Sequence, residues 1–317
     1  MEYRNLGNSG LQVSIAGLGC NNFGMRIDEA ETQTVVDAAI DAGITFFDTA
    51  DVYGGTKSEE FLGRALGSRR HDVVIATKFA MPLGEGPYKR GGSRHYIYKT
   101  VEDSLRRLGT DYIDLYQMHQ PDSSTPIDET LRALDDLVRE GKIRYLGNSN
   151  FSGWQIADAD WTARDGHLTR FVSAQNEWSL LSRTVEHEVI PACDRFGLGQ
   201  LPFFPLASGF LTGKYRRGED LPEGTRLAAW AKAMPDRIAA QTSDANWDKL
   251  EGLTKFAEDR GHNILTLALC WLATSPVVSS VIAGATKVEQ ITGNVEATNA
   301  WRLSDQEMAE VDTILKG

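Results

Sequence analysis

The chain alternates short apolar runs with amphipathic stretches almost from end to end. The apolar runs are nearly continuous in hydrophobic residues, as expected of parallel strands that are buried on both faces. Eight of these runs are predicted strands: residues 14–19, 45–48, 73–78, 112–119, 143–149, 171–176, 200–205 and 278–282. Strands and helices that alternate in this way are typical of α/β proteins with a parallel sheet.

The stretches between the predicted strands have helical periodicity and helical end signals. Residues 29–42 have one apolar stripe and stop at Gly43, a residue that suits a helix C-cap. The other predicted helices are residues 58–66, 95–108, 126–140, 152–164, 185–196, 245–260, 287–299 and 304–315. Two long loops are predicted at 80–94 and 206–244, and long loops in compact domains are usually functional.

Eight strands, each followed by a helix over about 250 residues, describe a (β/α)8 or TIM barrel. The alternative is an open doubly wound sheet. Ahead of the first strand, two arms around Asn8-Ser9-Gly10 predict a β-hairpin, which could plug the N-terminal end of the barrel. We therefore expect an α/β protein with one barrel domain over residues 1–317, an N-terminal hairpin and a C-terminal helical extension.

Charge and cysteine content narrow the classes of partner. The 33 basic and 44 acidic residues leave a net charge of −11, which disfavours nucleic acid and anionic membranes as main partners. The sequence has three cysteines, Cys20, Cys193 and Cys270, and no C-x-x-C motif. An odd number without this motif argues against a disulfide framework and against a thiolate metal site. The polar first ten residues contain no signal-like apolar region, and the longest apolar run, 266–273, is too short to span a bilayer. We expect a cytoplasmic protein.

Four reactive side chains stand at or just after predicted strand ends, where barrels place their chemistry. They are Asp48, Tyr53, Lys78 and His119. Each alone has an ordinary structural interpretation: a turn cap, a packed aromatic, a surface lysine and a core histidine. Together they make chemical sense, because a lysine ammonium lowers the pKa of a nearby tyrosine and a carboxylate keeps that lysine charged and fixed. A neutral histidine can then orient a substrate carbonyl while Tyr53 donates a proton to it.

An ordered set of motifs covers nearly the whole chain and resembles the aldo-keto reductase superfamily. The motifs are G-L-G-C-N-N-F-G at 17–24, F-F-D-T-A-D-V-Y-G-G at 46–55, T-K-F at 77–79, the segment from V-E-D-S-L to Q-M-H at 101–119, G-K-I-R-Y-L-G-N-S-N-F at 141–151, A-Q-N-E-W-S-L-L at 174–181 and P-L-A-S-G-F-L-T-G-K-Y at 205–215. The first motif has Asn22 where a Rossmann fingerprint needs its third glycine, so that fingerprint fails.

The resemblance implies that the four residues above are the family's catalytic tetrad, with Tyr53 as the acid. It also implies an extended NADPH, with NADH possible, and a small carbonyl substrate. The expected cofactor-binding residues are Gly19, Cys20, Asn21, Asp48, Ser149, Asn150, Gln175, Phe203, Pro205, Leu206, Ser208, Gly213, Lys214, Gly284, Thr286, Lys287, Gln290 and Asn294. An alternative for Asn150 is to cap the following helix.

The chain also departs from the family pattern. Phe203 stands where the family often has tyrosine, which keeps an aromatic face for the nicotinamide. Gly284 and Gln290 replace the lysine and arginine of many NADPH-preferring members, which leaves Lys287 to compensate. We expect NADPH to be preferred over NADH.

Two other functions stay open. The chain also resembles the potassium-channel β-subunit branch, which would make it a cofactor-binding regulatory subunit. An unrelated barrel lyase or isomerase would need a metal site or a Schiff-base lysine, for which Lys78 is the candidate. The substrate pocket is expected to involve Asn22, Tyr53, Tyr88 and Trp178, with Trp230 and Trp301 either near it or in the core. The sequence does not set the oligomeric state.

Overall fold

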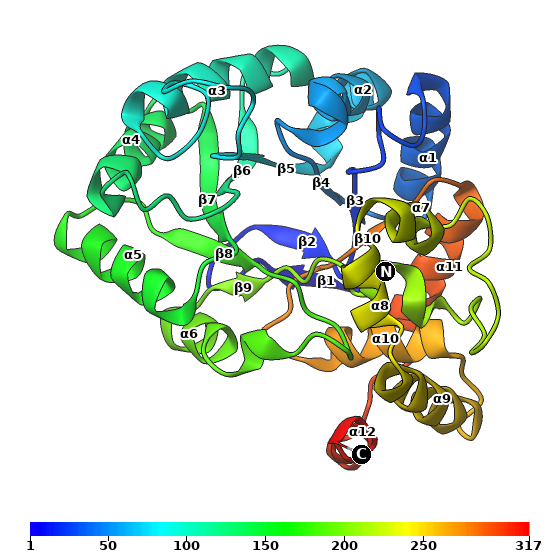
Figure 1. The fold of residues 1–317 in the computed structure, drawn as a ribbon. Coiled ribbons are helices and arrows are strands. Elements are labelled where there is room, and N and C mark those ends of the chain that lie inside the picture. Colours follow the sequence, from blue (N-terminus) through cyan, green and yellow to red (C-terminus); the bar gives the residue numbers. More distant parts are fainter. Residues whose placement is uncertain (317) are drawn as a thin grey trace.

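A computed structural model describes residues 1–316 as a closed barrel of eight parallel strands with helices outside (Figure 1). The strands, in their order around the barrel, are β10 (Val281–Gly284), β3 (Ala16–Gly19), β4 (Phe46–Asp48), β5 (Val74–Phe79), β6 (Ile113–Met118), β7 (Ile143–Ser149), β8 (Phe171–Gln175) and β9 (Gly199–Gln200). The ring closes where Gln200 forms a parallel bridge with Val278. The backbone N–H of Ile282 also donates to the Pro202 carbonyl at 3.1 Å. This closure confirms the barrel and excludes the open sheet.

Two predicted strands differ from the observed ones by three or more residues at one end. The strand expected at 200–205 is only the two residues of β9, because Pro202 and Pro205 have no N–H to donate to a ladder. The strand expected at 278–282 is shifted to β10, since Ser279 turns its hydroxyl to the Asn5 carbonyl of the N-terminal hairpin.

The helices between the strands cover the outside of the barrel (Figure 1). They are α1 (Glu29–Asp41), α2 (Lys57–Leu66), α3 (Arg94–Leu108), α4 (Ile127–Arg139), α5 (Gly153–Asp165), α6 (Val189–Phe196), α7 (Arg226–Ala233), α8 (Pro235–Gln241), α9 (Asp244–Glu258), α10 (Ile264–Thr274), α11 (Val288–Asn299) and α12 (Asp305–Lys316). Short 3-10 helices occur at Tyr53–Thr56, Gly67–Asp72, Thr184–Glu186 and Ala207–Thr212. The final helix, α12, is the expected C-terminal extension.

Three helices were missing from the sequence prediction. Helix α10 is buried along most of its length, so it is apolar on every side and has no amphipathic period. Helices α7 and α8 lie inside the segment predicted as a loop at 206–244. Thr225 caps α7 by accepting from the Ala228 N–H at 3.3 Å, and Pro235 stands in the first turn of α8.

The N-terminal hairpin packs against the bottom of the barrel, as predicted. Strands β1 (Tyr3–Asn5) and β2 (Gln12–Ser14) pair antiparallel. Leu6 and Val13 are fully buried and pack in one cluster with residues of the barrel strands, including Phe46, Leu115 and Ile282. The opposite, C-terminal end of the barrel is therefore the end left for chemistry. In residues 1–316, no helix is both long and apolar enough to cross a membrane.

Candidate active site

A buried ion pair stands at the C-terminal end of the barrel. Asp48 is the last residue of β4, and Lys78 is near the end of the neighbouring β5. The Lys78 Nζ donates to Asp48 Oδ2 and to the Thr49 carbonyl oxygen, both at 2.7 Å, and the Lys78 side chain is fully buried. The Nζ also lies 3.4 Å from the Tyr53 hydroxyl, and the His119 ring meets the Tyr53 ring edge-on at 5.7 Å between centroids. The structure thus brings the four predicted residues together.

Two buried glutamines hold Asp48 from the side opposite Lys78. Gln117 on β6 and Gln175 on β8 donate their side-chain N–H groups to Asp48 Oδ1, at 3.1 and 2.8 Å. A buried ion pair is stable only when the remaining lone pairs and protons are also satisfied, so these amides stabilise the pair. Gln117 was missed by the sequence prediction, although it lies on a strand next to the tetrad. Gln175 was predicted to bind the cofactor, and in the structure its side-chain N–H donates to Asp48.

The pKa values of the tetrad follow from burial and from this ion pair. Burial opposes the charge of Lys78, but Asp48 and Tyr53 together raise its pKa, so the lysine stays protonated. Burial raises the pKa of Tyr53, and Lys78 only partly offsets this effect. Lys78 therefore does lower the Tyr53 pKa, as expected, but desolvation of the phenolate outweighs the attraction of the ammonium. Burial and the nearby Lys78 hold the pKa of His119 well below its usual value, which keeps the imidazole neutral.

One cavity of about 790 Å³ opens above the tetrad. Every predicted cofactor residue lines it except two, Cys20 and Gly213. The Cys20 side chain is fully buried in the core, and Gly213 ends a 3-10 helix with a φ of 79°, so its role is in the turn. Lys78 is also absent from the lining. This burial argues against the Schiff-base alternative, because a carbonyl substrate in the cavity would not reach its amine.

The loop after β7 turns its polar groups toward the cavity. Asn150 has a φ of 60°, and its Nδ2 donates to the His119 carbonyl oxygen at 2.9 Å and to Ser149 Oγ at 3.0 Å. Ser152 is the N-cap of α5, and its N–H donates to Gln155 Oε1 at 3.0 Å. Asn150 therefore does not cap this helix, and its side chain links the β7 loop to the histidine loop.

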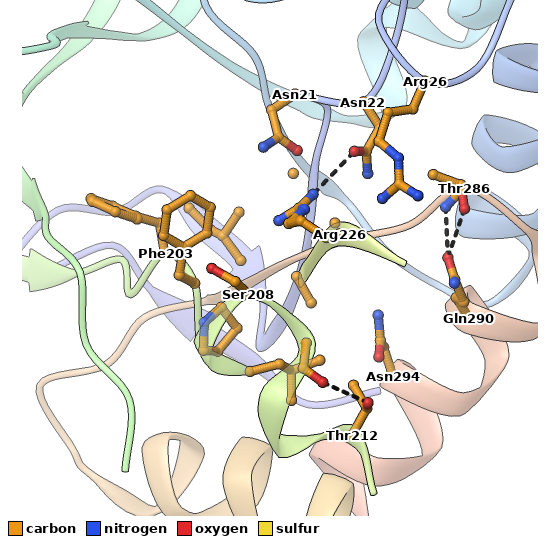
Figure 2. A pocket seen from close by; sticks show the side chains of 18 of the residues that line it. Asn21, Asn22, Arg26, Phe203, Ser208, Thr212, Arg226, Thr286, Gln290 and Asn294 are labelled. Carbon is orange, nitrogen blue, oxygen red and sulfur yellow. Dashed lines mark hydrogen bonds between the residues drawn. The ribbon is translucent and has the colours of Figure 1, made fainter. Parts of the chain in front are cut away.

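Four cations line the cavity beyond the tetrad: Arg26, Lys214, Arg226 and Lys287. The two arginines were missed by the sequence prediction. Figure 2 shows Arg226 in the middle of the cavity, with its Nη2 donating to Asn22 Oδ1 at 3.0 Å. Arg26 donates to the Gly224 carbonyl oxygen at 2.8 Å. Among the ion pairs found within residues 1–316, none includes Arg226, Arg26 or Lys214. Burial, with Arg26 and Arg226 nearby, lowers the pKa of Lys214, as expected for cations without a carboxylate partner.

Most of the expected substrate aromatics lie elsewhere. Tyr88 is exposed beside His95, and Trp178 is buried against Trp271. Trp301 stacks on His262, outside the cavity lining. Of the residues expected to shape the substrate pocket, Asn22 and Tyr53 line the cavity. Trp230 lies near it, because its ring meets that of the lining residue Phe204 edge-on at 5.6 Å between centroids.

The described residues contain no group of three or more His, Cys, Asp or Glu side chains arranged to hold a metal ion.

Comparison with known proteins agrees with this geometry. The model of the Aldo/keto reductase family matches residues 16–316. A probable voltage-gated potassium channel subunit beta of Oryza sativa subsp. japonica is 40% identical, over 98% of this chain and 95% of that protein. The uncharacterized oxidoreductase YrpG of Bacillus subtilis is 39% identical, over 94% and 91%. An L-glyceraldehyde 3-phosphate reductase of Escherichia coli is 34% identical, over 98% and 92%. With this match over nearly its whole length, the chain belongs to the aldo/keto reductase family.

Proposed function

We propose that this protein reduces an aldehyde or ketone to an alcohol with NADPH, or with NADH less readily, and that Tyr53 donates the proton. The observation that carries this proposal is the Tyr53 hydroxyl, 3.4 Å from a buried ammonium that Asp48 holds at 2.7 Å. A phenol, a fixed cation and a neutral imidazole meet at the floor of one cavity. General acid catalysis of this kind contributes roughly 10²–10⁴-fold.

Each member of the tetrad has a distinct task. A reduced nicotinamide, when bound, would supply the hydride that the carbonyl carbon needs. Tyr53 gives its hydroxyl proton to the carbonyl oxygen and becomes a phenolate, so the alcohol product gains one hydride and one proton. Lys78 stabilises that phenolate where little water screens the charge. His119 is neutral and orients the carbonyl by hydrogen bonding.

The remaining cavity residues fit an extended dinucleotide. Lys214 and Arg226 form a positive region in a chain whose net charge is −11, and that region suits a diphosphate. Ser208 adds a hydroxyl near Arg226, and Phe203 offers an aromatic face on the side of the cavity away from Thr286 and Gln290 (Figure 2). Asn294 and Gln290 line the far end, where adenosine would lie. Because Cys20, Cys193 and Cys270 are buried and unpaired, we also propose a reducing, cytoplasmic location.

Binding and turnover test the proposal separately. We expect tryptophan fluorescence to be quenched saturably by NADPH and more weakly by NADH. The variant Tyr53→Phe should bind both cofactors like the original chain and lose turnover of aldehydes. Turnover retained by a pure Tyr53→Phe preparation would exclude Tyr53 as the proton donor, and absence of binding to either nucleotide would exclude the reductase function.

A regulatory subunit is the second candidate. The relatives named as potassium channel β subunits, 40% identical to this chain, favour it. Such a protein would bind the cofactor with little turnover and would associate with a membrane partner. Fast multiple turnover of carbonyl substrates by the isolated protein would favour the enzyme instead.

A further inference from the structure

The far end of the cavity has Gly284 and Gln290 where the sequence comparison expects a lysine and an arginine in an NADPH-preferring enzyme. Gly284 has no side chain, and the Gln290 carboxamide oxygen accepts the Thr286 backbone N–H at 2.7 Å, which ties Gln290 to its own loop. Lys287 also lines the cavity, and both Lys287 and Arg26 are exposed to solvent. No hydrogen bond among the described residues holds the Lys287 ammonium, so a cation held in place at this end would have to come from another segment of the chain.

Arg26 is in position to be that cation. It lies in the loop between β3 and α1, and its side chain lines the cavity. Its Nη2 donates to the Gly224 carbonyl oxygen at 2.8 Å, and none of the ion pairs found in residues 1–316 includes it. A guanidinium has five N–H donors, so most of them remain for an anion. The planar fork of a guanidinium can hold a phosphate with two parallel hydrogen bonds.

The cations are arranged at two positions along the cavity. In the view of Figure 2, Arg226 lies toward Phe203, whereas the Arg26 guanidinium lies between Arg226 and Thr286. Thr286 precedes the first turn of α11, where backbone N–H groups lack helical partners and favour an anion. Arg226 and Lys214 thus suit the central diphosphate, while Arg26 faces the end where the adenosine ribose would lie.

We propose that Arg26 determines the preference of this protein for NADPH, by binding the phosphate on the adenosine 2′-oxygen. This inference rests on the proposed reductase function. Arg26 then takes the place of the basic residues absent at Gly284 and Gln290. Because the same guanidinium bonds the Gly224 carbonyl, it also links the 2′-phosphate to the segment that leads into α7.

Equilibrium binding tests this inference without turnover. The probes are NADPH, NADH and adenosine 2′,5′-bisphosphate, titrated against the original chain and against Arg26→Gln and Arg26→Lys. Loss of a charge-assisted hydrogen bond should weaken NADPH and bisphosphate binding by about tenfold or more in Arg26→Gln. Affinity for NADH should not change, and Arg26→Lys should lie between the two. A matched control is Arg106→Gln, which removes an exposed arginine paired with Asp103 on α3.

The alternatives give different patterns. Equal losses for NADPH and NADH in Arg26→Gln would place Arg26 on the diphosphate and overturn the inference, as would unchanged NADPH affinity. Equal affinity of the original chain for NADPH and NADH would overturn it while leaving the reductase function intact. Binding of neither nucleotide by the original chain would instead overturn the proposed function. Thermal denaturation of each variant would confirm that the fold is retained.

Discussion

Asp51 should make the stability of this protein fall as the pH rises toward 8. Its carboxyl is fully buried, and neither oxygen has a hydrogen-bond partner among the described residues. The nearby Glu59 is also fully buried and already accepts from Arg107 and Thr77, each at 2.6 Å. Burial, with the charge of Glu59 nearby, raises the pKa of Asp51 from 3.8 to about 8. Asp51 therefore keeps its proton in the folded protein at neutral pH.

The sign follows from proton linkage. The unfolded chain releases the Asp51 proton above about pH 4, whereas the folded chain holds it until about pH 8. Between these values the unfolded state is favoured by up to about 1.4 kcal/mol for each pH unit. At pH 7 the loss relative to acidic conditions is at most about 4 kcal/mol. Above pH 8 this contribution stays constant.

The variant Asp51→Asn removes the titration while keeping the shape of the side chain. We measure the free energies of unfolding of the variant and the original chain with urea from pH 5 to pH 9. The difference between them, in favour of the variant, should increase up to about pH 8 and stay constant above it. Asp128→Asn, which removes an exposed carboxylate on α4, should show no such gain. Parallel curves for Asp51→Asn and the original chain over the whole range would mean that Asp51 is ionised in the folded protein, and would refute the argument.

Two further substitutions test the site geometry. Lys78→Met should abolish turnover and lower the free energy of unfolding by about 3–5 kcal/mol, because it leaves Asp48 buried without its cation. Adding Asp48→Asn should restore stability but not turnover. A double variant that unfolds in urea as easily as Lys78→Met would count against a stabilising ion pair. Gly54→Ala should lower turnover and stability, since Gly54 has a φ of 59° and a Cβ there would collide with the Phe23 carbonyl oxygen. Unchanged activity and melting temperature in this variant would show that the loop after Tyr53 adapts.

The four tetrad residues could be predicted from the sequence because they lie at, or a few residues after, the ends of predicted strands. Asp48 and Lys78 lie on adjacent strands, and the residue after β6 is His119, so the barrel alone brings them to one end. The cations were harder to predict. Arg226 lies on α7, inside a segment without a clear apolar stripe, and the direction of Arg26 depends on how its loop folds. Helix α10 was missed because a helix buried on all sides has no amphipathic pattern.

The pKa of Tyr53 could not be predicted because it depends on the balance of burial and charge, which spacing does not determine. The raised value nevertheless suits a proton donor, because the phenol stays protonated until a carbonyl oxygen gains negative charge. Lys78 matters most when the phenolate forms. An ionised Asp51 would weaken that effect, since its negative charge would oppose the ammonium at Tyr53. A carboxyl kept neutral by burial next to the tetrad therefore preserves the positive field on which proton transfer from Tyr53 depends.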